Sequence, residues 1–177
     1  MTSLDPKAVA RAPRLQLQAT GFRNQAKGYD PRSGEGARRF GGRFNPPRSF
    51  PVLYLCTTRA CVAAELTRQA TRQNVDVSGL LPRELWQFDV DLEAVLDLTN
   101  PAVMAAISVT AQDLVRDDVA LTQHIGEAAY EHGYQAIRSQ SATGVDDVLA
   151  IFPENLAGAD PHIALLTTWT QKADLAD

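Results

Sequence analysis

Residues 28–47 restrict the possible fold more than any other part of the chain, because they are rich in Gly, Pro, Asn and Ser and show neither helical nor strand periodicity. These residues are therefore predicted to be mostly loop. Loops of this length are uncommon inside compact domains and are usually either functional or disordered. Arginines and aromatic residues are interleaved with the glycines here, which favours a functional loop. The fold must therefore hold a long functional loop between ordered elements.

Regular elements are predicted after this loop from hydrophobic periodicity. Residues 51–56 form a short apolar run that is typical of a buried strand. Thr57 or Thr58 is then expected to cap a helix over residues 59–72. Apolar and polar side chains alternate over residues 86–90, which predicts a half-buried strand. Further strands are expected at residues 95–98, 135–138, 148–152 and 163–170. Further helices are expected at residues 101–107 and 119–132, and Gly133 is expected to end the second of these. A short helix is expected after the capping pair Thr110 and Asp113.

Strands and helices are interspersed in this order without the strict alternation of a doubly wound sheet, which predicts an α+β fold. The 177 residues are 45% hydrophobic and 21% charged, as in ordinary globular proteins, so we expect a single compact domain with a core. The first twenty residues contain no apolar run long enough for a signal peptide or a membrane helix. A cytoplasmic protein that does not enter membranes is expected.

Cysteine and histidine usage argues against a metal site. Cys56 and Cys61 have no histidine nearby, so free thiols are expected and neither a disulfide nor a zinc site is indicated. The histidines His124, His132 and His162 are scattered without metal-ligand spacing. We predict no metal.

Charge is distributed unevenly along the chain. Residues 23–48 carry a net charge of +5, whereas the whole chain carries −4. A basic focus in an acidic protein suits a small anionic ligand better than nucleic acid, which usually needs a basic domain. A solvated arginine-rich loop is the alternative explanation. The glycines of this stretch form neither a dinucleotide-binding GxGxxG after a strand nor a phosphate-binding loop with a following lysine, so Rossmann and kinase-like folds are not expected.

Three side chains outside the loop could carry chemistry, although each has an ordinary explanation when it is considered alone. Tyr54 could stack on a flat heterocycle or fill the core. Glu65 lies in a small and apolar helix segment and could simply pair with Arg68 at helix spacing. Ser141 follows a predicted strand, where serine is commonly a turn residue.

Considered together, these segments resemble the RES family, which is named for an arginine, a glutamate and a serine. The resemblance rests on Gly21-Phe22-Arg23, the glycine-arginine loop over residues 33–47, Tyr54-Leu55, Ala64-Glu65 and Ser141, and extends over residues 21–155. Two positions depart from the pattern. Asn24 follows the first arginine where relatives carry an aromatic residue, and Gln140 precedes Ser141 where proline is common, which leaves Ser139 as a rival to Ser141.

The resemblance implies a fold similar to that of ADP-ribosyltransferases and a toxin that degrades NAD+ by cleaving the bond between nicotinamide and ribose. It implies a RES domain over residues 21–177, with its C-terminal strand or tail, after an N-terminal extension of residues 1–20. It also implies that Arg43, Tyr54, Glu65 and Ser141 are catalytic, and that Arg23, Arg43 and Tyr54 hold NAD+. Gly34, Gly42 and Asn45 are predicted to bind NAD+ as well, because they belong to the loop whose glycines let a ligand approach the backbone. In this scheme Glu65 stabilises an oxocarbenium-like charge on the ribose, and the arginines hold the diphosphate.

The resemblance also implies a partner. RES toxins are made together with an antitoxin, which we expect to cover the active-site cleft. Two other functions stay open: an ADP-ribosyltransferase that modifies a protein, and a non-catalytic nucleotide-binding module. Water, phosphate or a macromolecule could accept the ADP-ribose.

Overall fold

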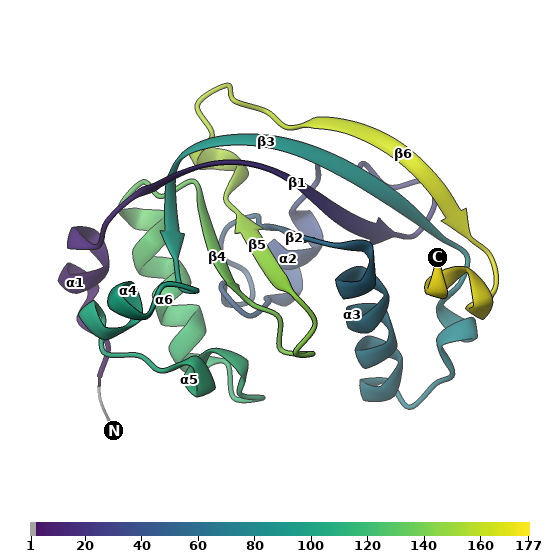
Figure 1. The fold of residues 1–177 in the computed structure, drawn as a ribbon, viewed down its shortest axis with the longest axis horizontal. Coiled ribbons are helices and arrows are strands. Elements are labelled where there is room, and N and C mark those ends of the chain that lie inside the picture. The colour runs from purple at the N-terminus through teal and green to yellow at the C-terminus, as the bar shows by residue number, and fades with distance from the viewer. Residues whose placement is uncertain (1–2) are drawn as a thin grey trace.

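The computed structural model describes residues 3–177 and combines strands with helices around a partly closed sheet (Figure 1). Its elements follow one another in an order that does not alternate strictly, which confirms the predicted α+β class. Their bounds are α1 (Pro6–Arg11), β1 (Leu15–Gln25), α2 (Glu35–Phe40), β2 (Leu53–Cys56), α3 (Arg59–Arg72), η1 (Val77–Leu80), β3 (Arg83–Asp97), α4 (Pro101–Ala106), α5 (Ala111–Val115), α6 (Ala120–Glu131), β4 (Ala136–Gln140), β5 (Asp147–Ile151), η2 (Pro153–Asn155), β6 (His162–Trp169) and η3 (Lys172–Ala176).

The sheet has the strand order β1-β2-β5-β4-β3-β6, and an additional pairing between β1 and β3 closes its first five strands into a ring. The long strands β1 and β3 run antiparallel from Leu15 opposite Val95 to Gln25 opposite Glu84. Together with β6 they arch over the shorter strands (Figure 1). Apolar side chains of β2, β3 and β5, among them Leu53 and Phe88, pack into one buried cluster. Burial of each such side chain stabilises the ring by about 1.5–3 kcal/mol.

Two separate groups of helices cover the ring (Figure 1). Helices α1, α4, α5 and α6 pack around a cluster that includes Phe44, Ile125 and Phe152. Helix α3 packs on the opposite side, where Leu66 lies with Leu85 and Trp169. A cavity lined by residues of α3 and of the segment that joins α5 to α6 lies between the two groups.

Several predicted elements are confirmed. Helix α3 covers residues 59–72 as expected, and Thr58 caps it by accepting a hydrogen bond from the N–H of Cys61 at 3.1 Å. The capping box of Thr110 and Asp113 is present. Helix α6 ends immediately before the turn at Gly133, whose φ of +78° is a conformation that glycine adopts without strain.

Other predictions were wrong in detail. The two strands expected at 86–90 and 95–98 are one strand, β3, because period-two burial continues through its charged residues. Residues 28–47 are mostly loop, as predicted, but they also contain the short helix α2, which was not predicted. Strand β1 was not predicted at all. The boundary proposed between residues 20 and 21 falls inside β1, and Val9 of α1 is fully buried in the core.

Candidate active site

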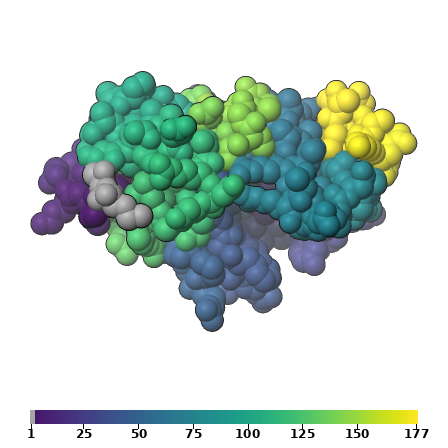
Figure 2. Space-filling model, turned by 90° about the horizontal axis from the view of Figure 1, so that it is seen from below, coloured from purple at the N-terminus to yellow at the C-terminus, as the bar shows by residue number. Residues whose placement is uncertain are grey.

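A cavity of about 860 Å³ lies between α3, α2 with its following turn, and the segment that joins α5 to α6. Figure 2, which looks at the molecule from below, shows this hollow between the blue of α3 and the green of the α5 and α6 region. Its volume is within the range of small-molecule sites. The predicted residues that line it are Arg23, Gly42, Arg43, Tyr54 and Glu65.

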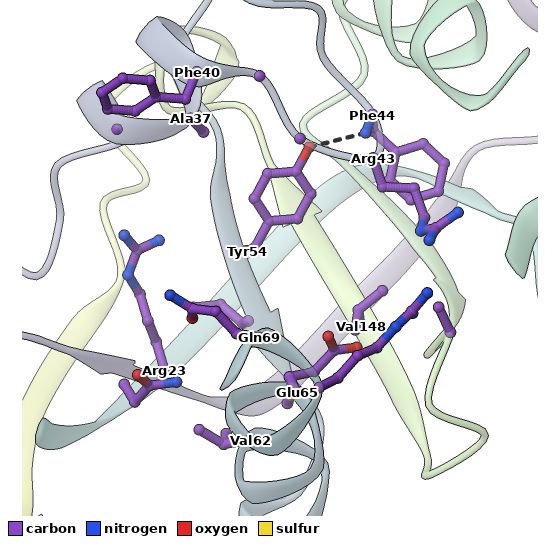
Figure 3. A pocket seen from close by; sticks show the side chains of 18 of the residues that line it. Arg23, Ala37, Phe40, Arg43, Phe44, Tyr54, Val62, Glu65, Gln69 and Val148 are labelled. Carbon is purple, nitrogen blue, oxygen red and sulfur yellow. Dashed lines mark hydrogen bonds between the residues drawn. The ribbon is translucent and has the colours of Figure 1, made fainter. Parts of the chain in front are cut away.

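Figure 3 shows how the labelled side chains lie around this cavity: Tyr54 and Glu65 face the same space, and Arg23 and Arg43 lie on opposite sides of it. Each comes from a different element or connection. Arg23 belongs to β1, Arg43 to the turn after α2, Tyr54 to β2 and Glu65 to α3. The pairing of β2 with β1 and the packing of α3 behind them therefore bring these side chains together.

Glu65 is held in place by Ser141. The Ser141 hydroxyl donates to Oε1 of Glu65 at 2.6 Å, and Ser141 itself is fully buried. Because a serine hydroxyl has a single hydrogen, the 2.7 Å contact between Ser141 and Thr143 has the Thr143 hydroxyl as donor. The N–H of Val145 in turn donates to Thr143 Oγ1 at 3.2 Å. A chain of hydrogen bonds that starts from the backbone thus orients the Glu65 carboxylate.

Ser139 does not take part in this chain. It is also fully buried, but the hydrogen-bond partner of its hydroxyl is the carbonyl of Gln140 at 3.5 Å. The ordinary explanation for Glu65, an ion pair with Arg68, was wrong, because Arg68 pairs with Asp117 instead. Thr143 was missed in the sequence, although it stands two residues after Ser141 in a turn.

Tyr54 has its phenol group fully engaged by the protein. The hydroxyl donates to Oδ1 of Asn45 at 2.7 Å and accepts from the N–H of Phe44 at 2.9 Å. Burial raises the pKa of Tyr54, so the phenol stays protonated at neutral pH. A Cβ on Gly42 would lie 2.6 Å from the Tyr54 oxygen, so only glycine fits there. The ring of Tyr54 is therefore a fixed wall of the cavity.

Asn45 and Gly34 do not line the cavity. Asn45 is fully buried, and its Nδ2 donates to the carbonyl of Ala37 at 2.7 Å, which ties α2 to Tyr54. A Cβ on Gly34 would meet the N atom of Val52 at 2.6 Å, so this glycine permits close packing of backbone. Both residues were predicted to bind NAD+ because of their position in the loop. In the structure they lie behind the residues that line the cavity.

Arg23 is partly buried, and its Nε has no hydrogen-bond partner among residues 3–177. Burial lowers the pKa of Arg23, and the neighbouring Arg83 lowers it further. Arg83 also lines the cavity, and its Nε donates to Oδ1 of Asn24 at 2.9 Å. The polar residue that departs from the family pattern at position 24 thus positions a second arginine. A buried guanidinium with an unused donor is suited to an anionic ligand.

One nitrogen of the Arg43 guanidinium is bound to the protein backbone. Its Nη1 donates to the carbonyl oxygens of Leu114 at 3.1 Å and Arg116 at 2.7 Å. Burial lowers the pKa of Arg43, and the positive charges of Arg68 and Arg72 lower it further. The other donors of Arg43 stay free to meet a ligand.

Arg68 and Arg72 line the cavity but were not singled out in the sequence. They lie three and seven residues after Glu65, which places all three on one face of α3. Each donates an Nη2 hydrogen to the same oxygen, Oδ1 of Asp117, at 2.9 Å and 3.1 Å. Helix spacing from Glu65 was the signal that could have identified them.

Residues 3–177 contain no group of three or more His, Cys, Asp or Glu side chains that could hold a metal ion. Over the same residues no helix is both long and apolar enough to cross a membrane. Cys56 and Cys61 are free thiols, as expected.

Comparison with known proteins gives consistent matches over most of the chain. The model of the RES domain matches residues 13–174. The NAD(+) phosphorylase MbcT of Mycobacterium tuberculosis and that of Mycobacterium bovis are each 34% identical over 142 residues, which is 79% of this chain and 76% of theirs. The crystal structure of the M. tuberculosis MbcT-MbcA toxin-antitoxin complex contains a chain with a similar fold, at a TM-score of 0.79 and 28% identity over 97% of this chain and 94% of that one.

Proposed function

Because this chain belongs to the RES domain family, we propose that it is the toxin of a toxin–antitoxin pair and degrades NAD+ by cleaving the bond between nicotinamide and ribose. One observation carries the proposal: a carboxylate, Glu65, is oriented by buried hydrogen bonds in a cavity that is otherwise rich in arginine, in a chain similar to an NAD(+) phosphorylase. We further propose that the fold belongs to the ADP-ribosyltransferase-like class and that the protein acts in the cytoplasm.

The chemistry of the bond explains why a fixed carboxylate suffices. Nicotinamide leaves as a neutral molecule with the electron pair of the C–N bond, so no proton has to reach it. Positive charge then develops on the ribose, and a preorganised negative group beside that charge lowers the barrier. Glu65 supplies this group. Ser141 is a positioning residue that acts through Glu65, because its only hydroxyl hydrogen is committed to that carboxylate.

The remaining side chains would hold the substrate. The Tyr54 ring offers a flat face against which nicotinamide can stack, since its hydroxyl is already satisfied. Arg23 and Arg43 are the predicted partners of the diphosphate, because guanidinium forks bind phosphate oxygens in pairs. Gly42 lets the Tyr54 ring pack directly against the backbone, which fixes the position of the ring.

We also propose a cognate antitoxin that covers this cavity, in keeping with the toxin-antitoxin complex of the similar MbcT chain. The exposed side of α2 supports such an interface. Phe40, which lines the cavity, is 79% exposed and would offer the antitoxin an aromatic contact, a residue type that is enriched in protein interfaces. Acidic groups of the antitoxin would meet the arginines of the cavity.

The test is a time course of NAD+ with the purified protein, with and without inorganic phosphate, read by product mass. Nicotinamide release is expected without any macromolecular target, and Glu65→Gln should lower its rate by a factor on the order of 10² to 10³. Glu131→Gln, at an exposed position of α6, is the matched control and should match the parent. Release only after addition of a target protein would favour an ADP-ribosyltransferase, and binding of NAD+ without turnover would contradict both enzymatic functions.

A further inference from the structure

The arginines of the cavity form two groups. Arg23 and Arg83 are neighbours on one side, and Arg43, Arg68 and Arg72 are neighbours on the other. Figure 3 shows Arg23 and Arg43 on opposite sides of the line from Tyr54 to Glu65. A diphosphate held by Arg23 and Arg43 leaves Arg68 and Arg72 without an anion from the substrate. The cavity therefore has the charge pattern of two separate anion subsites.

The charge balance points the same way. The cavity is lined by five arginines and by only two carboxylates, those of Glu65 and Asp117, which leaves an excess of three positive charges. NAD+ carries a single net negative charge, because its cationic ring offsets part of the diphosphate. Phosphate as a second substrate would bring the missing negative charge, whereas water as the acceptor would bring none.

Asp117 shows where a second anion can be bound. Two guanidinium groups converge on its Oδ1, although one carboxylate oxygen neutralises only part of their charge. The side chain of Asp117 is 88% exposed, so the protein does little to hold it there, and exposed ion pairs of this kind are worth only about 0–1 kcal/mol. An anion with more oxygens and more charge can replace it.

We propose that Arg68 and Arg72 form the subsite for inorganic phosphate as the acceptor of the ADP-ribosyl group, and that Asp117 occupies this subsite until phosphate displaces it. The inference rests on the proposed function. Arg68 lies three residues after Glu65 on the same face of α3, so an anion bound there is adjacent to the carboxylate that faces the reacting ribose carbon. Arg23, Arg43 and Arg83 are then left for the diphosphate of NAD+.

The step balances as follows. A phosphate oxygen forms a bond to the ribose carbon with its own electron pair, while the C–N bond breaks and its electrons leave with neutral nicotinamide. The products are nicotinamide and an ADP-ribose phosphate ester. A proton carried by the phosphate is lost to solvent afterwards, and no oxidant or further reactant is needed.

The test measures initial nicotinamide release and product mass at saturating NAD+ while inorganic phosphate is varied at constant ionic strength. Arg72→Gln should raise the KM for phosphate by about tenfold, since a charge-assisted hydrogen bond is worth about 1.5–3 kcal/mol, with a much smaller change in the KM for NAD+. Asp117→Asn should lower the KM for phosphate, because it weakens the competing ligand. Arg59→Gln, which removes the same charge from an exposed position of α3 outside the cavity, should change neither constant.

Two results would overturn the subsite. One is an unchanged KM for phosphate in both Arg72→Gln and Asp117→Asn; the other is ADP-ribose as the sole product of the parent at high phosphate. Failure of the proposed function can be distinguished from failure of the subsite. If the parent protein consumes no NAD+, its binding of inorganic phosphate can still be measured by calorimetric titration. Binding that Arg72→Gln weakens and Asp117→Asn strengthens supports the subsite there, and binding that neither variant alters contradicts it.

Discussion

Glu65 owes its orientation to a serine 76 residues further along the chain, and this dependence can be tested at the level of one hydroxyl group. Ser141→Ala removes the hydrogen bond and should lower the kcat for NAD+ cleavage by about tenfold, because a charge-assisted hydrogen bond of this kind is worth about 1.5–3 kcal/mol. Ser139→Ala is the matched control: it is the same substitution at an equally buried site, and its hydroxyl does not contact Glu65. Steady-state kinetics on both variants measures the difference. Equal kcat values in the two variants would remove Ser141 from the mechanism.

Arg43 gives a second prediction at this scale. Arg43→Lys keeps the charge, but an ammonium group cannot bridge the carbonyls of Leu114 and Arg116 and also present a fork to the ligand. The affinity for NAD+ should therefore fall by about tenfold. Calorimetric titration in the Glu65→Gln background, where NAD+ is not consumed, measures it. An unchanged affinity would mean that the substrate does not contact Arg43 and would move its anion contacts to Arg23 and Arg83.

The role of a residue could be predicted where the family pattern includes that residue. It could not be predicted where the role depends on a contact with a residue far away in the sequence. Arg23, Arg43, Tyr54 and Glu65 could all be placed at the cavity from the sequence. Arg68 was missed, although helix spacing from Glu65 could have placed it at the cavity; only its pairing with Asp117, which lies 49 residues away, was not predictable. Asn45 was assigned to the ligand because position in a loop does not distinguish a side chain that faces a cavity from one that supports it.

Among the elements, α6 packs unusually closely on the loop that follows α2. A Cβ built on Gly126 would lie 1.6 Å from the carbonyl oxygen of Phe44, which is backbone and cannot rotate away. Gly126→Ala should therefore lower the free energy of unfolding by about 1–3 kcal/mol or more, despite the higher helix propensity of alanine. Denaturant unfolding measures this. Gly36→Ala, in α2 with nothing within 4 Å of the added Cβ, is the control and should be neutral or slightly stabilising; a stable Gly126→Ala would contradict the close approach.

The elements that were predicted well are those with local signals. Helix α3 has its cap and its apolar positions within one continuous segment, so periodicity identified it. Strand β1 was missed because only two of its 11 residues are buried and its pairing is with β3, where Gly21 lies opposite Phe88. Helix α2 was missed because glycines flank and interrupt a helix of only six residues.

For the whole molecule, the prediction concerns competition between substrate and antitoxin. If a segment of the antitoxin enters the cavity beside α2, saturating NAD+ should weaken antitoxin binding, because both ligands need the same arginines. The affinity for the cognate antitoxin is measured in the Glu65→Gln background at rising NAD+. Phe40→Ala should also weaken antitoxin binding, and Tyr29→Ala, an equally exposed aromatic outside the cavity lining, is its control. Antitoxin affinity that saturating NAD+ leaves unchanged would place the inhibitory surface elsewhere.

The hydrogen bond from Ser141 to Glu65 also has a consequence while the chain is being synthesised on the ribosome. A chain that has been synthesised only as far as α3 already contains Arg23, Arg43, Tyr54 and Glu65, yet its carboxylate has no partner to orient it. Ser141 follows Glu65 by 76 residues, and this stretch requires roughly 4–15 s of translation at about 5–20 residues per second. Nascent chains without Ser141 are therefore expected to cleave NAD+ more slowly than the finished chain, and an antitoxin already present has until release of that chain to bind it.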